Sequence, residues 1–563
     1  MTLSICFYLI VKTNFIKIIW RLDVMKNKIL LLFIILVTVS LFSMCGLNRN
    51  EHTKKSTSVY DETITLQNMN YNEENNIYNI DYQKNLYDQI KNFKSSEKFT
   101  IENPLVIINP FETNEVGIYL YFETDDKSYV EYTIHVNENE INDFTNILYN
   151  GQKNNLTNEH EYVLIGGVAG KENIVTLNLY NKNSELYCTK TFKVTLPELD
   201  PGSDYILTKE SGTSDENLSD GLFVTMGHIN NENNNNNTYY YDNNGICRAQ
   251  INLDSYRVDR LVFQNGFMYM SVSKNKIAAL DRLGYVNEVY DLGKYEMHHD
   301  YILDDKGNLL ILVSDTESDS AEDKVISLNL KNKDIKEIID LGLLFPDIKE
   351  KAVLPEEKDK LDWVHVNSLT LVDNNTLLLS GRELSTIINV TNIYDEPKLN
   401  YLISDEKMWR DTDYYNIVYE KEGDFLIHGG QHTITVDNDN NLNKGQYYLY
   451  LYNNNTGVSS HYPDYDWNEA KDINTDSMYY KYLVDENEKT YSLIKKIDLL
   501  PSRYISSVQE YKNHIIADSG QNYTIYEFDS KDELIAKFLI EEKMWGLYRC
   551  FKYDFNNFYF YEI

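Results

Sequence analysis

The feature that most constrains this chain is a loosely repeated unit of short strands in its C-terminal part. Leu261–Leu292 (LVFQNGFMYMSVSKNKIAALDRLGYVNEVYDL) is typical, with an apolar strand, an Asn-Gly turn, a second strand and a third that ends in a polar turn. Similar units of about 35 to 60 residues follow, and a shorter segment opens the series: His299–Leu341, His365–Ile403, Asn416–Tyr462, Ser506–Leu539 and Gly221–Ile251. Such repeats are typical of a β-propeller, because each blade can bury its faces only against neighbouring blades.

The repeats therefore predict an all-β protein with a six-bladed β-propeller over residues 215–563, and seven blades remain the alternative. The last strand, within Tyr548–Ile563, is expected to close the ring. A β-rich block at 99–200 precedes the propeller, and its apolar residues alternate as in half-buried strands at Val116–Glu123 and Tyr129–Val136. About a hundred residues of short strands predict a small β-sandwich of the Ig-like type.

The N-terminal region has the features of an export signal. Basic residues from Met25 to Lys28 precede an apolar run, Ile29–Phe42, which is short for a membrane span but suits a signal-peptide core. Cys45 ends this core as in bacterial lipoproteins, so we expect a signal peptide at 25–44 and lipidation of Cys45 on the extracellular face of a bacterial cell membrane. An uncleaved anchor is the alternative, and translation of residues 1–24 is left open.

Residues 45–98 are polar and lack sustained periodicity, which predicts a flexible tether with a short helix around Tyr82–Phe93. The chain holds 87 Asp and Glu against 53 Lys and Arg, and this acidic balance argues against a nucleic-acid partner. The five cysteines fit no zinc site or disulfide framework, although a Cys247–Cys550 bridge is left open. Asp437–Asn441 resembles the start of a calcium loop, but Leu442 replaces its glycine, so we expect a solvated turn.

The scarce histidines fall at comparable places in successive units. His299, His365 and His432 each lie on the first strand of a unit or on the strand after it, and Arg382 follows in the same series. Because the innermost strand of each blade lines the central channel, residues far apart in the sequence can converge there. The pattern predicts a polar site in the channel. Three other histidines match no motif and are predicted to be structural: His428, His461 and His514.

The motifs around these residues resemble the bacterial arylsulfate sulfotransferases that need no nucleotide sulfate donor. They are Asp362–Ser368 (DWVHVNS), Leu378–Arg382 (LLSGR), Gly430–Thr433 (GQHT) and His298–Asp300 (HHD), in the family's order and separation. In the preceding block, Asn109-Pro110 and His160–Gly167 with Asn173 are similar to the family's N-terminal domain. The resemblance covers residues 99–563.

The resemblance implies that His432 attacks sulfur and carries the sulfuryl group, while His299, His365 and Arg382 bind the sulfate and phenolic oxygens. It implies ping-pong transfer from a phenolic sulfate ester to another phenol, with no cofactor or metal. A sulfuryl group in flight resembles a phosphoryl group, so positioning and charge stabilisation are the expected sources of catalysis. The histidine that protonates the leaving phenolate is left open, as are the choices between His298 and His299 and between Ser506 and Ser507.

Two alternatives stay open. The first is a non-catalytic cell-surface propeller that binds carbohydrate or protein, since a fold does not imply a function. The second is an enzyme of the same fold that uses a metal or quinone cofactor. The lack of clustered carboxylate ligands around the histidines argues against it. The natural donor and acceptor are not determined, and a homodimer is left open.

Overall fold

The computed structural model describes residues 64–72, 76–199, 206–227, 237–439, 441–465, 475–541 and 546–562. The predicted signal peptide, Cys45 and the beginning of the tether lie outside these residues. Among the described residues, no helix is both long enough and apolar enough to cross a membrane.

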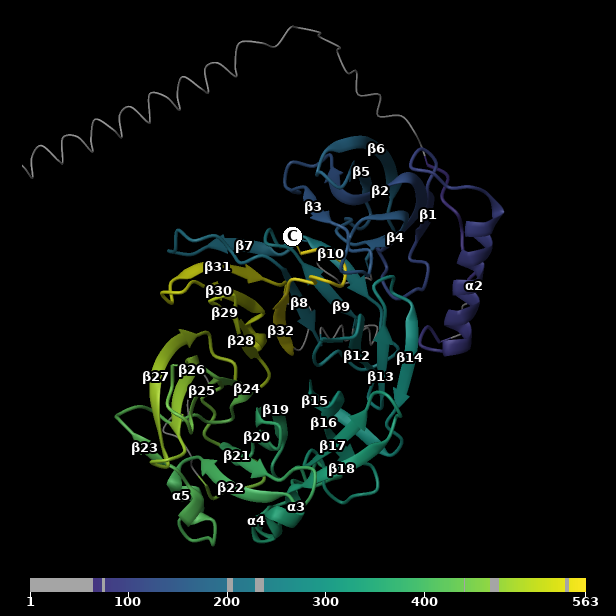
Figure 1. Ribbon diagram of the computed structural model, residues 1–563. Helices are drawn as coiled ribbons and strands as arrows, with labels where there is room; N and C mark the ends of the chain where they lie inside the picture. The colour runs from purple at the N-terminus through teal and green to yellow at the C-terminus, as the bar shows by residue number, and fades with distance from the viewer. Residues whose placement is uncertain are drawn as a thin grey trace, which may run out of the picture. The chain divides into compact units, whose positions relative to one another are not determined.

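Six sheets of four or five strands, nearly all antiparallel, follow one another along the chain and form the blades of a propeller (Figure 1). The first blade contains β8 (Leu222–Met226), β9 (Thr238–Tyr241), β10 (Cys247–Ile251) and β32 (Arg549–Tyr553). The second contains β11 (Val262–Gln264), β12 (Phe267–Ser273), β13 (Lys276–Leu280) and β14 (Val286–Asp291). The third contains β15 (Tyr295–Leu303), β16 (Asn308–Asp315), β17 (Lys324–Asn329) and β18 (Ile335–Asp340).

The fourth blade contains β19 (Val366–Asp373), β20 (Thr376–Gly381), β21 (Thr386–Thr391) and β22 (Lys398–Ile403). The fifth contains β23 (Glu420–Glu422), β24 (His432–Asp437), β25 (Gln446–Asn453), β26 (Ser477–Asp485) and β27 (Thr490–Leu499). The sixth contains β28 (Ser507–Tyr511), β29 (His514–Ser519), β30 (Thr524–Phe528), β31 (Leu534–Leu539) and β7 (Thr208–Ser211).

The ring closes in two places. β32, from the C-terminal end, pairs with β8 of the first blade, and β7, from before the first blade, pairs with β31 of the sixth. The predicted six-bladed propeller is thus confirmed, and so is closure by the last strand. The fifth blade extends beyond Tyr462, where the sequence analysis ended the unit, and includes β26 and β27. The prediction stopped too early because a polar stretch without a strand pattern precedes these two strands.

The block before the propeller is the predicted sandwich. Its strands are β1 (Leu105–Ile108), β2 (Ile118–Val136), β3 (Phe144–Ile147), β4 (Thr157–Leu164), β5 (Glu172–Tyr180) and β6 (Leu186–Thr195). β2 covers both of the strands that the sequence predicted at 116–123 and 129–136. Its first half pairs with β1 and β4 and its second half with β3 and β5, so this single strand belongs to both layers.

The helix predicted around Tyr82–Phe93 is confirmed as α2 (Ile80–Ser96), but it packs against the β domains and is not part of a flexible tether. Asn79 caps its first turn, and Leu86 and Ile90 are fully buried in a cluster with sandwich residues. The Gln83 side chain accepts from Val286 N at 3.3 Å and so joins the helix to β14. The other helices of the described residues are short: α3 (Leu341–Leu344), α4 (Pro346–Lys351), α5 (Glu406–Trp409), η1 (Tyr415–Ile417) and η2 (Gly520–Asn522).

The two cysteines of the first blade do not form the bridge that the sequence left open. Cys247 and Cys550 are buried free thiols on β10 and β32, the two opposite edges of the same sheet. Three strand spacings of about 4.8 Å separate these edges, which is well beyond the reach of a disulfide.

Candidate active site

Three neighbouring blades contribute their edge strands β15, β19 and β24 to one region near the centre of the ring (Figure 1). His299 lies on β15, where the pairing with β16 slips between Met297 and Tyr301. His432 opens β24, where the pairing with β25 slips before Thr435. Bulges of this kind turn a side chain away from its regular direction and are common next to active sites.

The same region concentrates unusual backbone conformations. His299 and His365 have φ angles of 59° and 47°, and Glu322 and Thr433 have φ angles of 55° and 54°. Residues with a side chain rarely adopt these left-handed angles, which cost of order 1–3 kcal/mol and cluster at functional sites. The chain is therefore held in this geometry by its surroundings.

The motifs that the sequence singled out are joined to one another through Gln431. Its main-chain oxygen accepts from Asn367 Nδ2 at 2.8 Å and from Ser380 Oγ at 3.1 Å. Asn367 and Ser380 belong to the two predicted motifs of the fourth blade. These buried bonds set the position of the next residue, His432.

His432 is buried, and its ring is oriented through Nδ1. This nitrogen lies 2.7 Å from Asn454 Oδ1 and 3.2 Å from the carbonyl oxygen of Gly430. The amide of Asn454 cannot be reversed without loss, because its Nδ2 donates to the carbonyls of Ser502 and Ile505. Nδ1 therefore faces only acceptors and carries the proton, which leaves the lone pair on Nε2. Burial and the nearby Arg382 charge lower the pKa of His432 to about 3, so the ring is neutral at pH 7.

His365 has the opposite surroundings. Its Nδ1 lies 2.5 Å from Asp362 Oδ2 and 2.9 Å from Glu322 Oε2. Burial and Arg382 lower the pKa of His365, but Asp362 and Glu322 outweigh both and raise it to about 9. Its Nε2 is buried and has no partner among the described residues.

His299 uses both ring nitrogens. Its Nε2 lies 2.9 Å from Glu322 Oε2, and its Nδ1 lies 2.7 Å from the Tyr548 hydroxyl. The Arg257 guanidinium lies 3.4 Å from the same Nδ1 and stacks over the Tyr548 ring at 3.6 Å. Burial is the main reason that the pKa of His299 falls well below its ordinary value, so this imidazole is neutral.

Arg382 follows β20 and lies beside the histidines. Its main-chain N donates to the carbonyl of His365 at 3.1 Å, and its side chain pairs with Glu383 through Nε and Nη2. Glu383 also accepts from Ser459. The guanidinium is thus held at one side by Glu383, which fixes its plane.

The residues that the sequence left open differ in their surroundings. His298 is buried, and neither of its nitrogens has a hydrogen-bond partner among the described residues. The neighbouring Asp300 pairs with Arg260 and Arg549. Ser506 Oγ donates to Ser502 Oγ and accepts from Gly520 N, and Ser507 donates to the carbonyl of Cys550. The three histidines predicted to be structural contact Tyr482, the Val353 carbonyl and Glu527: His428, His461 and His514.

Sequence reasoning missed the carboxylates of the site. It counted the lack of carboxylates near the histidines against a metal, yet Glu322 and Asp362 contact them directly. Two overlapping groups therefore offer metal-ligating atoms that lie close together: His298, His299 and Glu322, and Glu322, Asp362 and His365. Asp362 stands three residues before His365, which was a usable signal, whereas nothing in the spacing marks Glu322. Tyr548 and Asn454 were also missed.

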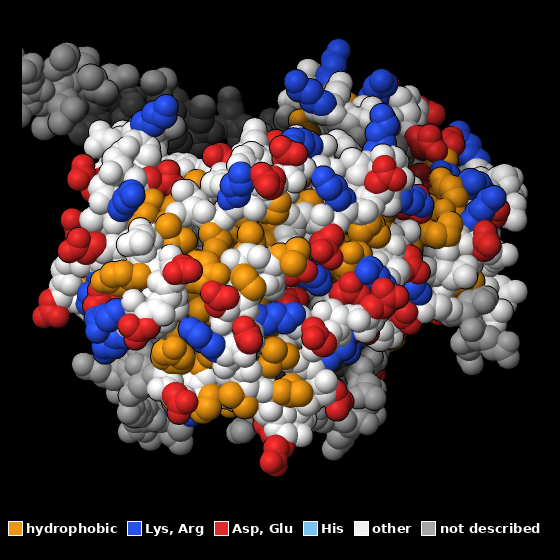
Figure 2. Space-filling model, turned by 90° about the horizontal axis from the view of Figure 1, so that it is seen from below, with side chains coloured by type: hydrophobic (Ala, Val, Ile, Leu, Met, Phe, Trp, Pro, Cys, Tyr) orange, Lys and Arg blue, Asp and Glu red, His pale blue; other side chains and the backbone are white. Residues whose placement is uncertain are grey.

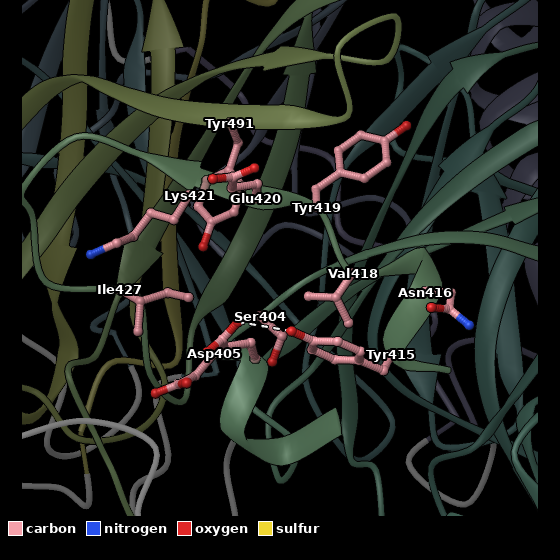
Figure 3. A pocket seen from close by; sticks show the side chains of 11 residues that line it. Ser404, Asp405, Tyr415, Asn416, Val418, Tyr419, Glu420, Lys421, Ile427 and Tyr491 are labelled. Atoms are coloured by element: carbon pink, nitrogen blue, oxygen red, sulfur yellow. Dashed lines mark hydrogen bonds between the residues drawn. The ribbon is translucent and has the colours of Figure 1, made fainter. Parts of the chain in front are cut away.

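A pocket and a mixed-charge face of the molecule lie outside this region. A pocket of about 710 Å³ lies between α5, η1 and β23 and is lined by side chains such as Tyr415, Tyr419 and Tyr491 (Figure 3). None of the four predicted site residues is among those labelled there. On the face seen in Figure 2, basic and acidic side chains are interspersed, so this face offers no continuous basic surface for a phosphate backbone.

Two family models match the chain. The model described as arylsulfotransferase (ASST) matches residues 207–544, which is more than half of the chain. The model described as the arylsulfotransferase Ig-like domain matches residues 105–197. No curated protein matches the chain.

Several solved structures align with the chain at low identity and low TM-score. The WD40 domain of coronin from Toxoplasma gondii is 7% identical and aligns over 60% of this chain and 77% of its own, with a TM-score of 0.30. BamB from Moraxella catarrhalis is 10% identical over 60% of this chain and 100% of its own, with a TM-score of 0.27. An auxiliary nutrient binding protein from Bacteroides thetaiotaomicron is 10% identical over 79% and 100%, with a TM-score of 0.27.

Proposed function

Because the chain belongs to the arylsulfotransferase family, we propose that it transfers a sulfuryl group between phenols in two steps, with His432 as the carrier. The donor is a phenolic sulfate ester rather than a nucleotide sulfate, and the acceptor is a second phenol. No resident metal or cofactor takes part.

The observation that carries this proposal is the environment of His432. A nucleophilic imidazole must be neutral and must present a lone pair, and Nδ1 of His432 is bonded to Asn454 and Gly430 as the protonated nitrogen of that form. The burial that lowers its pKa to about 3 keeps it neutral far below pH 7. A histidine without acceptors at Nδ1 would have no preference for this tautomer.

In the first step, Nε2 of His432 bonds to sulfur, and the bond between sulfur and the phenolic oxygen breaks. The phenolic oxygen leaves with the electron pair and takes up a proton. Arg382 and His365 contribute positive charge beside the sulfate oxygens, where the transition state gathers negative charge.

In the second step, the acceptor phenol loses its proton and its oxygen bonds to sulfur. The bond from Nε2 to sulfur then breaks, and His432 returns to its neutral form. Each half-reaction reverses the proton movement of the other, so the enzyme ends as it began.

A burst experiment tests the carrier. Incubation with an aryl sulfate alone should release about one equivalent of phenol per enzyme in a fast phase, because the covalent form accumulates when no acceptor is present. Peptide mapping at mildly alkaline pH should then place the added group on the peptide that contains Gln431, His432 and Thr433.

His135→Asn serves as the matched control, because His135 lies exposed on the sandwich and contacts only Asp143 and Asn137. This variant should keep the full burst. Label found on His299 or His365 would contradict the assignment of His432, and transfer without any burst would favour direct donor-to-acceptor transfer.

We also propose that the protein is exported and held at the extracellular face of the cell membrane by a lipid on Cys45. The support is the basic and apolar pattern of residues 25–44, which lie outside the described residues. Cys45→Ala should move the protein from the membrane fraction to the soluble fraction with unchanged activity. A variant that stays in the membrane would identify the apolar run as an anchor.

A further inference from the structure

Glu322 holds two of the site's histidines with one oxygen. Its Oε2 lies 2.9 Å from His299 Nε2 and 2.9 Å from His365 Nδ1, in the turn before β17. A carboxylate oxygen only accepts hydrogen bonds, so the nitrogen that faces it on each ring carries a proton. The contact with Glu322 therefore fixes the tautomer of His299. At His365 the Nδ1 proton is donated to Asp362, and Glu322 adds a second negative charge beside it.

The two rings differ at their other nitrogen. Nδ1 of His299 lies 2.7 Å from the Tyr548 hydroxyl and faces the Arg257 guanidinium. A second proton there would oppose the Arg257 donor and would make the hydroxyl turn to the carbonyl of His299, 3.3 Å away. Nε2 of His365 meets no such donor, since it is buried without a hydrogen-bond partner among the described residues. Only His365 can take its second proton without a clash between donors.

Resting on the function proposed above, we propose that Glu322 is a positioning residue that keeps His365 protonated at Nε2 and holds the single proton of the neutral His299 on Nε2. His365, and not His299, then gives the proton to the leaving phenolate.

The charges around His365 favour this arrangement. Glu322 and Asp362 both face its Nδ1, at 2.9 Å and 2.5 Å, and stabilise the imidazolium. Arg382 opposes it, but that charge is itself paired with Glu383. Together the two carboxylates raise the pKa of His365 to about 9 in spite of its burial.

Three other imidazoles of the channel lie near His365 and Glu322: His298, His299 and His432. Burial lowers the pKa of each of them, so none competes with His365 for the proton at neutral pH. The pKa of Glu322 is also held well below its ordinary value by His365 and His299, which keeps the carboxylate charged. One cationic imidazole and three neutral ones result.

The proton balance closes over the two half-reactions. As the bond from sulfur to the phenolic oxygen breaks, the Nε2 proton of His365 passes to that oxygen, and His365 becomes neutral. The acceptor phenol later gives its proton to Nε2 as its oxygen attacks sulfur. The donor half-reaction should therefore slow above about pH 9, where His365 loses its proton, and below about pH 3, where His432 gains one.

Glu322→Gln tests the role through the leaving group. An amide places less negative charge beside Nδ1, so the basic limb of the pH profile should move to lower pH. At pH 8 the burst with phenyl sulfate, a poor leaving group that needs the proton, should slow by about 10- to 100-fold. The burst with 4-nitrophenyl sulfate, whose phenolate needs little help, should slow by only a few-fold. Glu317→Gln is the control, because Glu317 is largely exposed and pairs only with Lys294.

A second measurement does not depend on activity or on the variant. ¹⁵N NMR of histidine-labelled wild-type enzyme, with His365→Gln and His299→Gln for assignment, should show His365 protonated on both nitrogens at pH 7 and His299 on one. A neutral His365 at pH 7 would overturn the proposal, and so would a Glu322→Gln enzyme with wild-type pH and leaving-group dependence. A missing burst in wild-type enzyme would instead count against the function proposed above.

Discussion

The two sides of the channel use the same residue type in opposite surroundings. On the side of β24, His432 contacts an amide oxygen and a carbonyl, which are neutral acceptors. On the side of β15 and β19, His365 and His299 share a carboxylate, and His365 contacts a second one. The pKa of His432 falls to about 3, whereas that of His365 rises to about 9.

This difference teaches that burial alone does not decide what a histidine can do. All of these imidazoles are buried, and burial by itself would make each of them neutral. A neutral acceptor at Nδ1 orients the ring without charging it and suits a nucleophile. A carboxylate at the same nitrogen orients the ring and charges it, which suits an acid and an anion ligand.

The largest effect is expected when His432, on the side with neutral acceptors, is replaced. His432→Asn should abolish both the burst and turnover, a loss of at least about 10⁴-fold, because no neighbouring group can replace the attacking nitrogen. The measurement is stopped-flow release of 4-nitrophenol with and without acceptor. A burst that persists in this variant would show that the two sides have exchanged roles.

Arg382→Lys probes the charge that both sides share. Lysine keeps the charge but loses the planar fork that Glu383 now holds, so transfer should slow by about 10²- to 10³-fold. Arg410→Lys is the matched control, since Arg410 is exposed just after α5 and should tolerate the change. Near-normal turnover of Arg382→Lys would make this arginine structural.

Asn454→Asp converts the neutral side into a copy of the carboxylate side. A carboxylate at Nδ1 should raise the pKa of His432, so the nucleophile is lost by protonation at a higher pH than before. The acid limb of the donor half-reaction should move upward, while Asn454→Leu, which adds no charge, should slow the reaction by about 10- to 100-fold without moving it. An unmoved acid limb in Asn454→Asp would separate the limb from His432.

Chelation should have the smallest effect. The carboxylate side offers atoms that could ligate a metal. However, Glu322 and Asp362 already accept hydrogen bonds from the histidines there. Dialysis against EDTA should leave the rate unchanged, with metal analysis of the protein as the accompanying measurement. Loss of activity that a divalent ion restores would show that a metal, rather than protons, joins these ligands.

The sequence contains enough to predict the ring and the histidines, but not the carboxylates. His299, His365 and His432 are visible because they are rare and recur at equivalent places in a repeat. Glu322 is one of 87 acidic residues, and it lies in the turn before β17 with a left-handed φ of 55°, which no sequence pattern marks. Tyr548 contacts His299 from another blade, and Asn454 contacts His432 from the end of the neighbouring strand of the same blade. No local sequence pattern records either contact.

The strand that closes the ring also completes the site, and this orders the events of biosynthesis. Tyr548 contacts His299, and Arg549, on β32, pairs with Asp300. A nascent chain cannot assemble this arrangement until the segment that carries β32 has been synthesised and released. Shortened products of proteolysis or premature termination that lack β32 lose both the closure and these contacts. They should therefore be inactive even where five blades have formed.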